Sequence, residues 1–486
     1  MRIVILGGGT AGYFTALYCR SIFPSNSITV IQNEEVGTIG VGEATTPILI
    51  DFLHCLNIDP IAMMKEIGGT IKNGIKFENW NGDGKSYYHP FKERNELGNF
   101  SIPPYFSSDC VDYYLRHLVN KGLDFKEHLY GAALSEENKV DIDNLFYALH
   151  FDAGRLATFL KKTAVDRGIQ IINGNYKDVE TDSNGFINKI LLDYGQVKCD
   201  FVFDCSGLAR LIVGKHFKDK WISYKSHLPM KKAIPFHLPN EADIKPYTRT
   251  ISMPHGWMWQ IPLADRIGAG YVFDSDYITP EQAQKEAEEY LGHPVKVSRV
   301  IDFEAGRFKN FWIKNCVAVG LSTGFLEPLE ATSLHVTISQ LQKLILFINT
   351  MHVHDQESVD LYNKLIAETM DANLEFVYLH YITKRSDTEF WRNLKKNYPP
   401  PEKFKKTLEV IRTGNIRFMN VAQGDAFPLF SYFMICNGLG LFEEGINITG
   451  YENLYPNVDQ YKLLLDEYRN RATLHTDFLN KAYTRN

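Results

Sequence analysis

The first residues whose types and spacing could do chemistry are three glycines near the start of the chain. Gly7, Gly9 and Gly12 follow the apolar run at residues 3–6 with the spacing G-x-G-x-x-G. In such a fingerprint the first glycine permits a tight turn, the second lets a diphosphate approach the backbone, and the third lets the next helix pack on the strand. A helix amino end also presents unpaired N–H groups and partial positive charge. The pattern predicts dinucleotide binding, with contacts from Gly7, Gly9, Thr10, Ala11 and Gly12.

A second apolar strand, at residues 28–31, follows at the distance that a strand–helix–strand unit requires. Folds of this type usually place Asp or Glu at its end to hold the ribose hydroxyls, but this chain has Gln32 there. An amide can hydrogen-bond a hydroxyl, although more weakly than a carboxylate does. These residues leave open which dinucleotide binds, and a glycine turn without a ligand is the alternative.

Composition excludes several other classes of protein. The net charge of −6, from 52 basic and 58 acidic residues, gives no indication of a nucleic-acid or anionic-membrane partner. Seven dispersed cysteines without a C-x-x-C pair favour reduced thiols and a cytoplasmic location. The first strand begins at once, so we expect no signal peptide, and the apolar runs are too short to span a bilayer. We expect no metal site, because His352 and His354 have no third ligand at a useful offset.

Periodicity predicts an α/β fold for most of the chain. Asp152 is expected to cap a helix whose apolar stripe contains Leu156 and Leu160, and a second helix is expected at 334–348. Residues 71–77 are expected to form one strand, and residues 81–145 to be irregular. Further strands are expected at 169–172, 187–192, 201–203 and 316–320. After residue 351 the periodicities are helical, with a break at three consecutive prolines, 399–401.

Three stretches are more specific than the glycine loop. They are Gly256–Pro262 with the pattern W-x-W-x-I-P, Gly320–Ser333, and Gly40–Thr45 with Lys72–Lys76 downstream. In this order they resemble the flavin-dependent halogenases of the tryptophan halogenase type, and the resemblance extends from residue 1 to about 395. It implies an FAD-binding, Rossmann-like fold similar to that of the aromatic hydroxylases. The expected organisation is an FAD-binding module at 1–350, with insertions at about 72–150 and 210–300, and a mainly helical module at 351–486 that completes the substrate pocket.

The resemblance also implies the chemistry. Family members take reduced FAD from a separate flavin reductase and use O2 and a halide to make hypohalous acid. This oxidant passes through a tunnel and halogenates an electron-rich aromatic substrate. The single glycine fingerprint agrees, because a chain without a second nucleotide loop needs its flavin reduced elsewhere. Chloride, bromide and iodide all remain open, as does assembly into a homo-oligomer.

Two residues match the catalytic pair of this family. Lys72 matches the essential lysine, which either donates a hydrogen bond to hypohalous acid or, as a neutral amine, forms a haloamine. Glu330 matches the essential glutamate, which could orient the electrophile and accept the proton lost from the arene. The neighbouring residues Lys76 and Glu327 are expected to be structural, Lys76 through an ion pair.

The resemblance assigns further binding roles. Backbone N–H groups of Thr332 and Ser333 would bind the halide at a helix amino end. This chain departs from the family pattern with Ala331 in place of the usual serine and Ser333 in place of glycine, which leaves halide preference open. Trp257 and Trp259 would shield the flavin from the organic substrate. The remaining cofactor contacts would come from Gln32, Gly42, Glu43, Ala44, Gly320 and Leu326.

His89 and Phe91 match residues that hold an indole ring, and aromatic faces suit a flat, electron-rich substrate. Phe427 and Phe430 are expected to line the same pocket, in a segment that lacks the Trp-Asn cluster used to grip tryptophan. We therefore expect indoles, phenols or similar arenes rather than free tryptophan. A flavin aromatic hydroxylase of the same fold and a non-catalytic flavin-binding protein are the alternatives.

Overall fold

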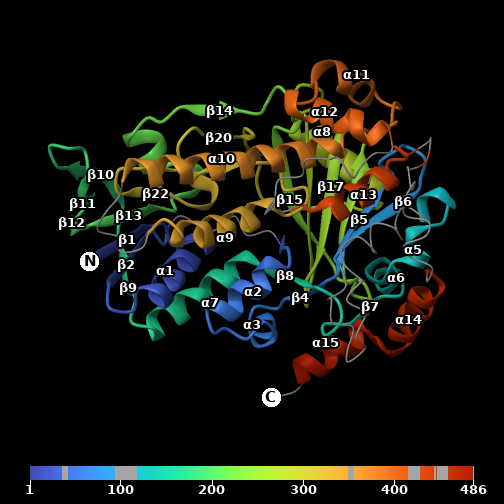
Figure 1. The fold of residues 1–486 in the computed structure, drawn as a ribbon, viewed down its shortest axis with the longest axis horizontal. Coiled ribbons are helices and arrows are strands. Elements are labelled where there is room, and N and C mark those ends of the chain that lie inside the picture. The colour runs from blue at the N-terminus through green and yellow to red at the C-terminus, as the bar shows by residue number, and fades with distance from the viewer. Residues whose placement is uncertain are drawn as a thin grey trace. The chain divides into compact units, whose positions relative to one another are not determined.

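The computed structural model describes residues 1–35, 42–92, 118–348, 355–413, 427–442, 445 and 458–484, except for the side chains of 127, 458–462 and 464. The chain forms two compact units, each assembled from three separate segments (Figure 1). Unit 1 contains Met1–Gly68, Phe151–Lys225 and Glu304–Asp371. Unit 2 contains Gly69–His150, Ser226–Phe303 and Ala372–Asn486. No helix in the described ranges is long and apolar enough to cross a membrane.

A six-stranded sheet organises unit 1. The strand order is β21 (Trp312–Ile313), β22 (Cys316–Ala318), β13 (Phe201–Asp204), β1 (Arg2–Leu6), β2 (Ser27–Gln32) and β9 (Gln170–Asn173). All neighbours are parallel except β21, which pairs antiparallel with β22 at one edge. Four of the five residues of β1 are buried, as the apolar run at 3–6 predicts. The central position of β1 places the glycine loop at the carboxyl edge of the sheet, where ligands of such folds bind.

The helices of unit 1 carry the sequence signals expected of them. They are α1 (Thr10–Ile22), α2 (Ile48–Cys55), α3 (Pro60–Glu66), α7 (Ala153–Asp166), α9 (Thr332–Ile345) and the first part of α10 (Gln356–Leu379). Asp152 caps α7 by accepting a hydrogen bond from the Arg155 N–H at 2.8 Å, and the buried stripe of α7 includes Leu156 and Leu160, which confirms the expectation. The short segments η1 (Gly207–Ala209), η2 (Leu211–His216) and η3 (Gly320–Ser322) follow β13 and β22.

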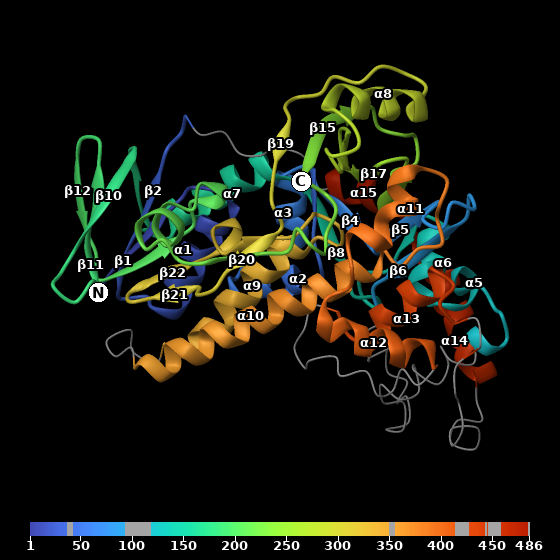
Figure 2. The ribbon, with the colours of Figure 1, turned by 90° about the horizontal axis from the view of Figure 1, so that it is seen from above.

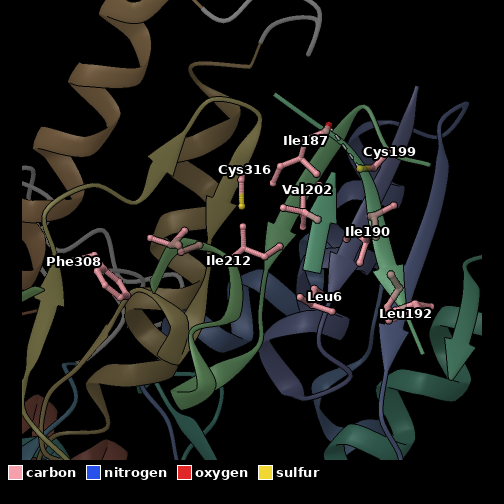
Figure 3. Close-up of a cluster of buried hydrophobic side chains, with 14 residues drawn as sticks. Leu6, Ile187, Ile190, Leu192, Cys199, Val202, Ile212, Phe308 and Cys316 are labelled. Atoms are coloured by element: carbon pink, nitrogen blue, oxygen red, sulfur yellow. Dashed lines mark hydrogen bonds between the residues drawn. The ribbon is translucent and has the colours of Figure 1, made fainter. Parts of the chain in front are cut away.

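Smaller strands complete unit 1. One sheet contains β10 (Tyr176–Thr181), β11 (Ile187–Leu192) and β12 (Gly195–Lys198), and another contains β14 (Trp221–Ser223), β20 (Gly306–Phe308) and β23 (Gly324–Phe325). Figure 2 shows β10–β12 as a separate three-stranded ribbon beside β1. A buried apolar cluster joins it to the main sheet, with Leu6 and Val202 lying near Ile187, Ile190 and Leu192 of β11 (Figure 3). The cluster includes Leu6, the residue directly before the glycine loop.

A seven-stranded sheet organises unit 2. The order is β19 (Ile301–Asp302), β15 (Lys232–Leu238), β18 (Ile267–Phe273), β17 (Gly256–Pro262), β16 (Thr248–Met253), β5 (Gly74–Glu78) and β6 (Ser86–Pro90). Met258, Tyr271 and other apolar residues on one face pack with α8 (Pro280–Leu291). Two short pairings lie outside this sheet: β4 (Thr70–Lys72) with β8 (Ala148–Asp152), and β7 (Lys139–Val140) with β24 (Thr473–Leu474).

The described C-terminal residues are mainly helical, as expected. After α10 they form α11 (Glu389–Asn397), α12 (Glu402–Arg412), α13 (Leu429–Gly438), α14 (Val458–Arg471) and α15 (His475–Thr484). The expectation that residues 81–145 are irregular was wrong, since β6, α5 (Phe125–His128), α6 (Tyr130–Glu136) and β7 lie there. The sequence predicts one module at 1–350 and another at 351–486, but described residues from each range belong to both compact units. The predicted boundary at residue 350 therefore stays a prediction.

The single strand expected at 71–77 was also wrong, because it breaks at Asn73 into β4 and β5. The Asn73 N–H donates to the Pro246 carbonyl at 2.6 Å, and its carbonyl accepts from the Phe91 N–H at 2.7 Å. These bonds to two distant segments take Asn73 out of the β4–β8 ladder. Lys76 thereby belongs to β5, not to the strand of Lys72, and in the described part of the chain its ammonium lies over the rings of Tyr88 and Tyr247 instead of in an ion pair.

Candidate active site

The glycine loop between β1 and α1 has the shape of a phosphate cradle. A Cβ on Gly12 would lie 1.9 Å from the Gly7 carbonyl oxygen, and a Cβ on Gly7, whose φ is 130°, would lie 2.1 Å from that of Cys205. A Cβ on Gly9 would meet nothing within 4 Å, so this position faces open space. Gly9 is also the N-cap of α1 and supplies no side-chain hydrogen bond. The first N–H groups of α1, at Thr10 and Ala11, therefore have no cap and face a site suited to an anion.

Gln32 lies at the end of β2 as expected, but its amide is engaged within the protein. Its Oε1 accepts a hydrogen bond from the Tyr13 hydroxyl at 2.6 Å, and its Nε2 donates to the Glu34 carboxylate at 2.8 Å. The Lys161 ammonium is 2.8 Å from the same carboxylate and holds the pKa of Glu34 below its ordinary value. The carboxylate that these folds usually place at this point is thus supplied two residues later, by Glu34.

The loop after β22 brings several expected cofactor residues beside α1. Gly320 has a φ of 72°, and a Cβ there would lie 2.7 Å from the Ala11 Cβ, so a side chain would collide with the first turn of α1. A small pocket continues from this contact, with a volume of about 10 Å³ open to water-sized molecules. Such a volume holds about one small solvent-sized species. Its lining includes Gly320, Leu326, Thr332 and Ser333.

The pocket lies at the amino end of α9, which begins at Thr332. Ala331 is the N-cap in a left-handed conformation, with φ 57° and ψ 37°, and supplies no side-chain hydrogen bond. A left-handed residue followed by helical residues turns successive N–H groups toward one point, which makes an anion-binding concavity. The Thr332 hydroxyl is buried and has no hydrogen-bond partner among the described residues. The Thr332–Ser333 amides and the Thr332 hydroxyl are thus hydrogen-bond donors of the kind that binds an anion at a helix amino end.

Glu330 precedes this helix and is itself strained. Its φ is 75°, its side chain is buried, and the next residue is left-handed as well. Two consecutive non-glycine residues in this region cost about 1–3 kcal/mol each. Glu327, the other carboxylate of the motif, is fully buried. The backbone of this segment is therefore held in an unfavourable conformation, which sets the direction of the Cα–Cβ bond of Glu330.

The segment Gly40–Thr45 is described from Gly42 onward, where β3 (Gly42–Ala44) begins. Burial, with the nearby charge of Asp152, raises the pKa of the Glu43 carboxyl to about 7. This carboxyl consequently changes charge near neutral pH. Three residues after Glu43, the Thr46 hydroxyl lies 2.8 Å from Nδ1 of His335 on α9. Burial lowers the pKa of His335 to about 4, so a neutral histidine connects this segment to α9.

Unit 2 contains Lys72, on β4. Its side chain is fully buried, and the ammonium lies 5.5 Å from the centroid of the Phe91 ring. On the adjacent strand β8, His150 pairs with Thr70 of β4. Burial, together with the Lys72 charge, keeps the pKa of His150 well below its ordinary value. His150 Nδ1 and Nε2 are 3.1 Å and 2.9 Å from the hydroxyls of Thr70 and Thr248. The neighbours of Lys72 thus include a neutral histidine and an aromatic ring.

The expected substrate residues in unit 2 form an aromatic cluster. The His89 ring lies 5.7 Å from Phe376 and 6.3 Å from Phe427, and those two phenylalanines stack at 3.9 Å. Phe91 follows β6 on the same alternation as His89 and contacts Lys72. The Lys92 ammonium lies 5.1 Å from the Phe430 ring. Sequence reasoning missed Phe376, because its place inside the long helix α10 gives no motif signal.

Trp257 and Trp259 lie on β17, and both are buried. Their rings meet edge to face at 6.2 Å, on the opposite face of the strand from Met258. Gly270 on β18 makes room for the Trp259 ring, since a Cβ there would lie 2.2 Å from it. The Trp257 indole N–H is buried and has no hydrogen-bond partner among the described residues. Lys72 belongs to unit 2 and Glu330 to unit 1. Their joint action in catalysis therefore stays a prediction.

Comparison with known proteins gives the family. The family described as Tryptophan halogenase matches residues 2–449. The chain belongs to the tryptophan halogenase family. It is 33% identical over 442 residues to the 7-chloro-L-tryptophan 6-halogenase KtzR of Kutzneria sp. (strain 744), with 85% of each chain covered. It is 31% identical over 430 residues to the tryptophan 6-halogenase SttH of Streptomyces toxytricini, with 82% of each chain covered.

Solved structures agree with this assignment. Xcc4156, a flavin-dependent halogenase from Xanthomonas campestris, superposes with a TM-score of 0.89 at 28% identity, over 99% of this chain and 98% of that one. BrvH, a flavin-dependent halogenase from Brevundimonas sp. BAL3, gives a TM-score of 0.86 at 28% identity, with 99% of both chains covered. The protein is a flavin-dependent halogenase with an α/β, FAD-binding fold, and the expected family was correct. The family implies FAD and a halide as cofactor and co-substrate.

The open space at Gly9 gives a direct test of cofactor binding by this halogenase. We expect Gly9→Ala to fold normally, because the new methyl group meets no protein atom, but to bind FAD at least tenfold more weakly, because the methyl occupies the approach of the diphosphate. Fluorescence titration with FAD measures the affinity, and thermal unfolding checks the fold. Gly195→Ala is the matched control, since a Cβ there also meets nothing within 4 Å. Unchanged FAD affinity in Gly9→Ala would remove the loop from the cofactor site.

Proposed function

We propose that this halogenase uses Lys72 and Glu330 to direct hypohalous acid onto an electron-rich arene. Bound FAD, reduced by a separate flavin reductase, would supply the oxidising chemistry that converts halide to hypohalous acid. The cofactor would be held by the amino end of α1 and by the Gly320 turn, whose Cβ position is closed by Ala11. The carboxylate of Glu34 or the amide of Gln32 would face the ribose.

The halide would bind at the amino end of α9. The support is the small pocket lined by Thr332 and Ser333, the uncapped first turn and the unpartnered Thr332 hydroxyl. Ala331 and Ser333, which depart from the usual family residues, retain backbone donors. The donors would be two backbone amides and one hydroxyl, and we propose that chloride and bromide are both used.

The observation that carries the catalytic proposal is the full burial of the Lys72 ammonium against an aromatic ring. Burying an ammonium costs free energy, so a lysine is kept in such a place where its charge is paired or where the group takes part in chemistry. Lys72 would polarise the O–halogen bond of hypohalous acid. The carbon–halogen bond then forms as the O–halogen bond breaks, and the leaving oxygen takes a proton from the Lys72 ammonium to become water. Glu330 accepts the proton from the arene carbon, and transfer of a proton back to the Lys72 amine restores both groups.

We propose an electron-rich arene such as an indole or a phenol as the substrate, with free tryptophan disfavoured. The support is the cluster of His89, Phe376 and Phe427, whose rings suit a flat ligand. Of the relatives, KtzR is named for 7-chloro-L-tryptophan and SttH for tryptophan. A cytoplasmic location is part of the proposal and fits the six free cysteines among the described residues.

The test is a product analysis with FAD, NADH, a flavin reductase and a panel of indoles, phenols and free tryptophan, in chloride or in bromide. We expect halogenated indoles or phenols with both halides, and less product from tryptophan. Mass spectrometry reads the isotope pattern of each product. Hydroxylated products, or products independent of halide, would contradict the proposal. Tryptophan as the best substrate would contradict its substrate part alone.

A further inference from the structure

The C-terminal segment of the described chain, β24 with α15, is built against the strand that bears Lys72. β24 pairs antiparallel with β7, with Thr473 opposite Val140. His475 follows β24 directly and begins α15. It is fully buried, and its side chain accepts a hydrogen bond from a backbone N–H of β4. All of these residues belong to unit 2.

Three hydrogen bonds fix the backbone on both sides of Lys72. The Ile71 N–H donates to Nε2 of His475 at 3.3 Å, one residue before the lysine. The Tyr483 hydroxyl donates to the Gly69 carbonyl at 2.7 Å. On the other side, the Asn73 side-chain amide donates to the Lys139 carbonyl of β7, the strand that pairs with β24, at 2.8 Å. The contacts therefore lie at positions −3, −1 and +1 relative to Lys72.

The His475 ring can satisfy its two partners in one protonation state only. A backbone N–H can only donate and the Ile244 carbonyl can only accept, so Nε2 is an acceptor and Nδ1 donates to Ile244 at 2.9 Å. Burial lowers the pKa of His475 to about 4, so the ring is neutral at pH 7. An imidazolium would instead point an N–H at the Ile71 N–H and would lose that bond.

We infer that His475 is a positioning residue for Lys72, and that the segment 473–484 holds the catalytic lysine in register for transfer of the halogen. This inference rests on the proposed role of Lys72. A shift of about 1 Å in a catalytic group can cost about 100-fold in rate, so a bond to the adjacent peptide has a measurable effect. The family match ends at residue 449, and thus the motifs that identify the family do not include this segment.

Two amide substitutions separate the two bonds of the ring. In His475→Gln the side-chain oxygen reaches the position of Nε2 and can accept from the Ile71 N–H. In His475→Asn the shorter amide replaces Nδ1 and donates to the Ile244 carbonyl, but leaves Ile71 without its acceptor. We expect His475→Asn to lower the kcat of arene halogenation at least tenfold with little change in KM, and His475→Gln to stay within threefold of the wild type.

A second readout distinguishes positioning from a general structural role. A small 1,3-diketone traps free hypohalous acid without help from Lys72, so its halogenation should be unchanged in both variants. His293→Asn, at an exposed histidine of the same unit, is the control. Equal loss of arene product in the Asn and Gln variants, or full activity of the Asn variant, would overturn the inference. Parallel loss of diketone halogenation would also overturn it.

If neither His475 variant folds, Tyr483→Phe tests the segment instead, since it keeps the aromatic ring but removes the hydroxyl that donates to the Gly69 carbonyl. We expect a two- to fivefold loss of arene product with unchanged trapping of the oxidant, and unchanged arene product would overturn the inference. Lys72→Ala, measured beside these variants, keeps the two proposals distinguishable. Full activity of Lys72→Ala removes the proposed function, whereas its inactivity together with an active His475→Asn variant removes only the positioning role.

Discussion

Replacing Lys72 by Ala is expected to lower arene halogenation by at least about 100–1000-fold, the loss typical of a preorganised donor at a reacting group. The ammonium is fully buried beside the Phe91 ring, so neither water nor a neighbouring lysine can readily take its place. FAD affinity and trapping of free hypohalous acid by a 1,3-diketone should stay at wild-type levels, because the residues proposed to bind FAD and halide belong to unit 1. Product formation by mass spectrometry and the two controls are measured on the same preparation.

Lys76→Ala is the matched control, because Lys76 belongs to the same motif but lies on β5 over Tyr88 and Tyr247. It should retain most activity. Lys72→Arg separates the two roles proposed for the lysine, since a guanidinium donates hydrogen bonds but stays protonated. Residual activity well above that of Lys72→Ala would favour the donor role, and equal inactivity would favour a haloamine. An active Lys72→Ala variant would end the catalytic assignment.

Replacing Glu330 by Gln is expected to lower arene halogenation about 100-fold while the oxidant still forms. The amide has nearly the same shape but cannot accept the proton lost from the arene, and removal of a positioned base typically costs this much. Kinetics at saturating substrate should show the loss in kcat. The pocket at Thr332 and Ser333, which we propose binds the halide, keeps its backbone donors, so halide dependence should persist. A Glu330→Gln variant as fast as the wild type would exclude the carboxylate from the reaction.

The left-handed backbone of Glu330 allows a second experiment, which measures stability. Because its φ is 75°, Glu330→Gly should relieve strain and raise the unfolding midpoint even as activity falls. Lys314→Gly is the control, at another left-handed residue of unit 1 whose side chain is exposed. It should raise stability similarly and leave activity unchanged. A fall in stability of Glu330→Gly would mean that the carboxylate is retained for structure instead of chemistry.

Much of the site could be predicted because its signals are local. The apolar run of β1, the spacing of Gly7, Gly9 and Gly12, and the Asp152 cap are encoded within a few residues, and the structure has them where the sequence predicts. The helix expected at 334–348 is α9, which begins two residues earlier than expected, at Thr332. The family itself was recognisable because several motifs occur in one order along the chain.

Other parts depended on contacts between distant segments. The break between β4 and β5 has no strong local signal, because it arises from the bonds of Asn73 to Pro246 and Phe91. The sequence also contains no signal for the hydrogen bonds of the Gln32 amide to Tyr13 and Glu34. The same holds for the ring contact between Phe376 and His89. A histidine such as His475, 403 residues after Lys72, gives no signal in the linear chain that it bonds the adjacent peptide.

The sequence by itself determined the chemistry that is available: a phosphate-binding turn, an uncapped helix for an anion, and a lysine and a glutamate in family motifs. These depend on backbone conformation and side-chain type, which short-range sterics and hydrogen bonding specify. Tertiary structure decided how each group is held, because burial and hydrogen bonds from remote segments set its orientation and its charge. The neutral His150 and His475 near the buried Lys72 are the result of that long-range packing.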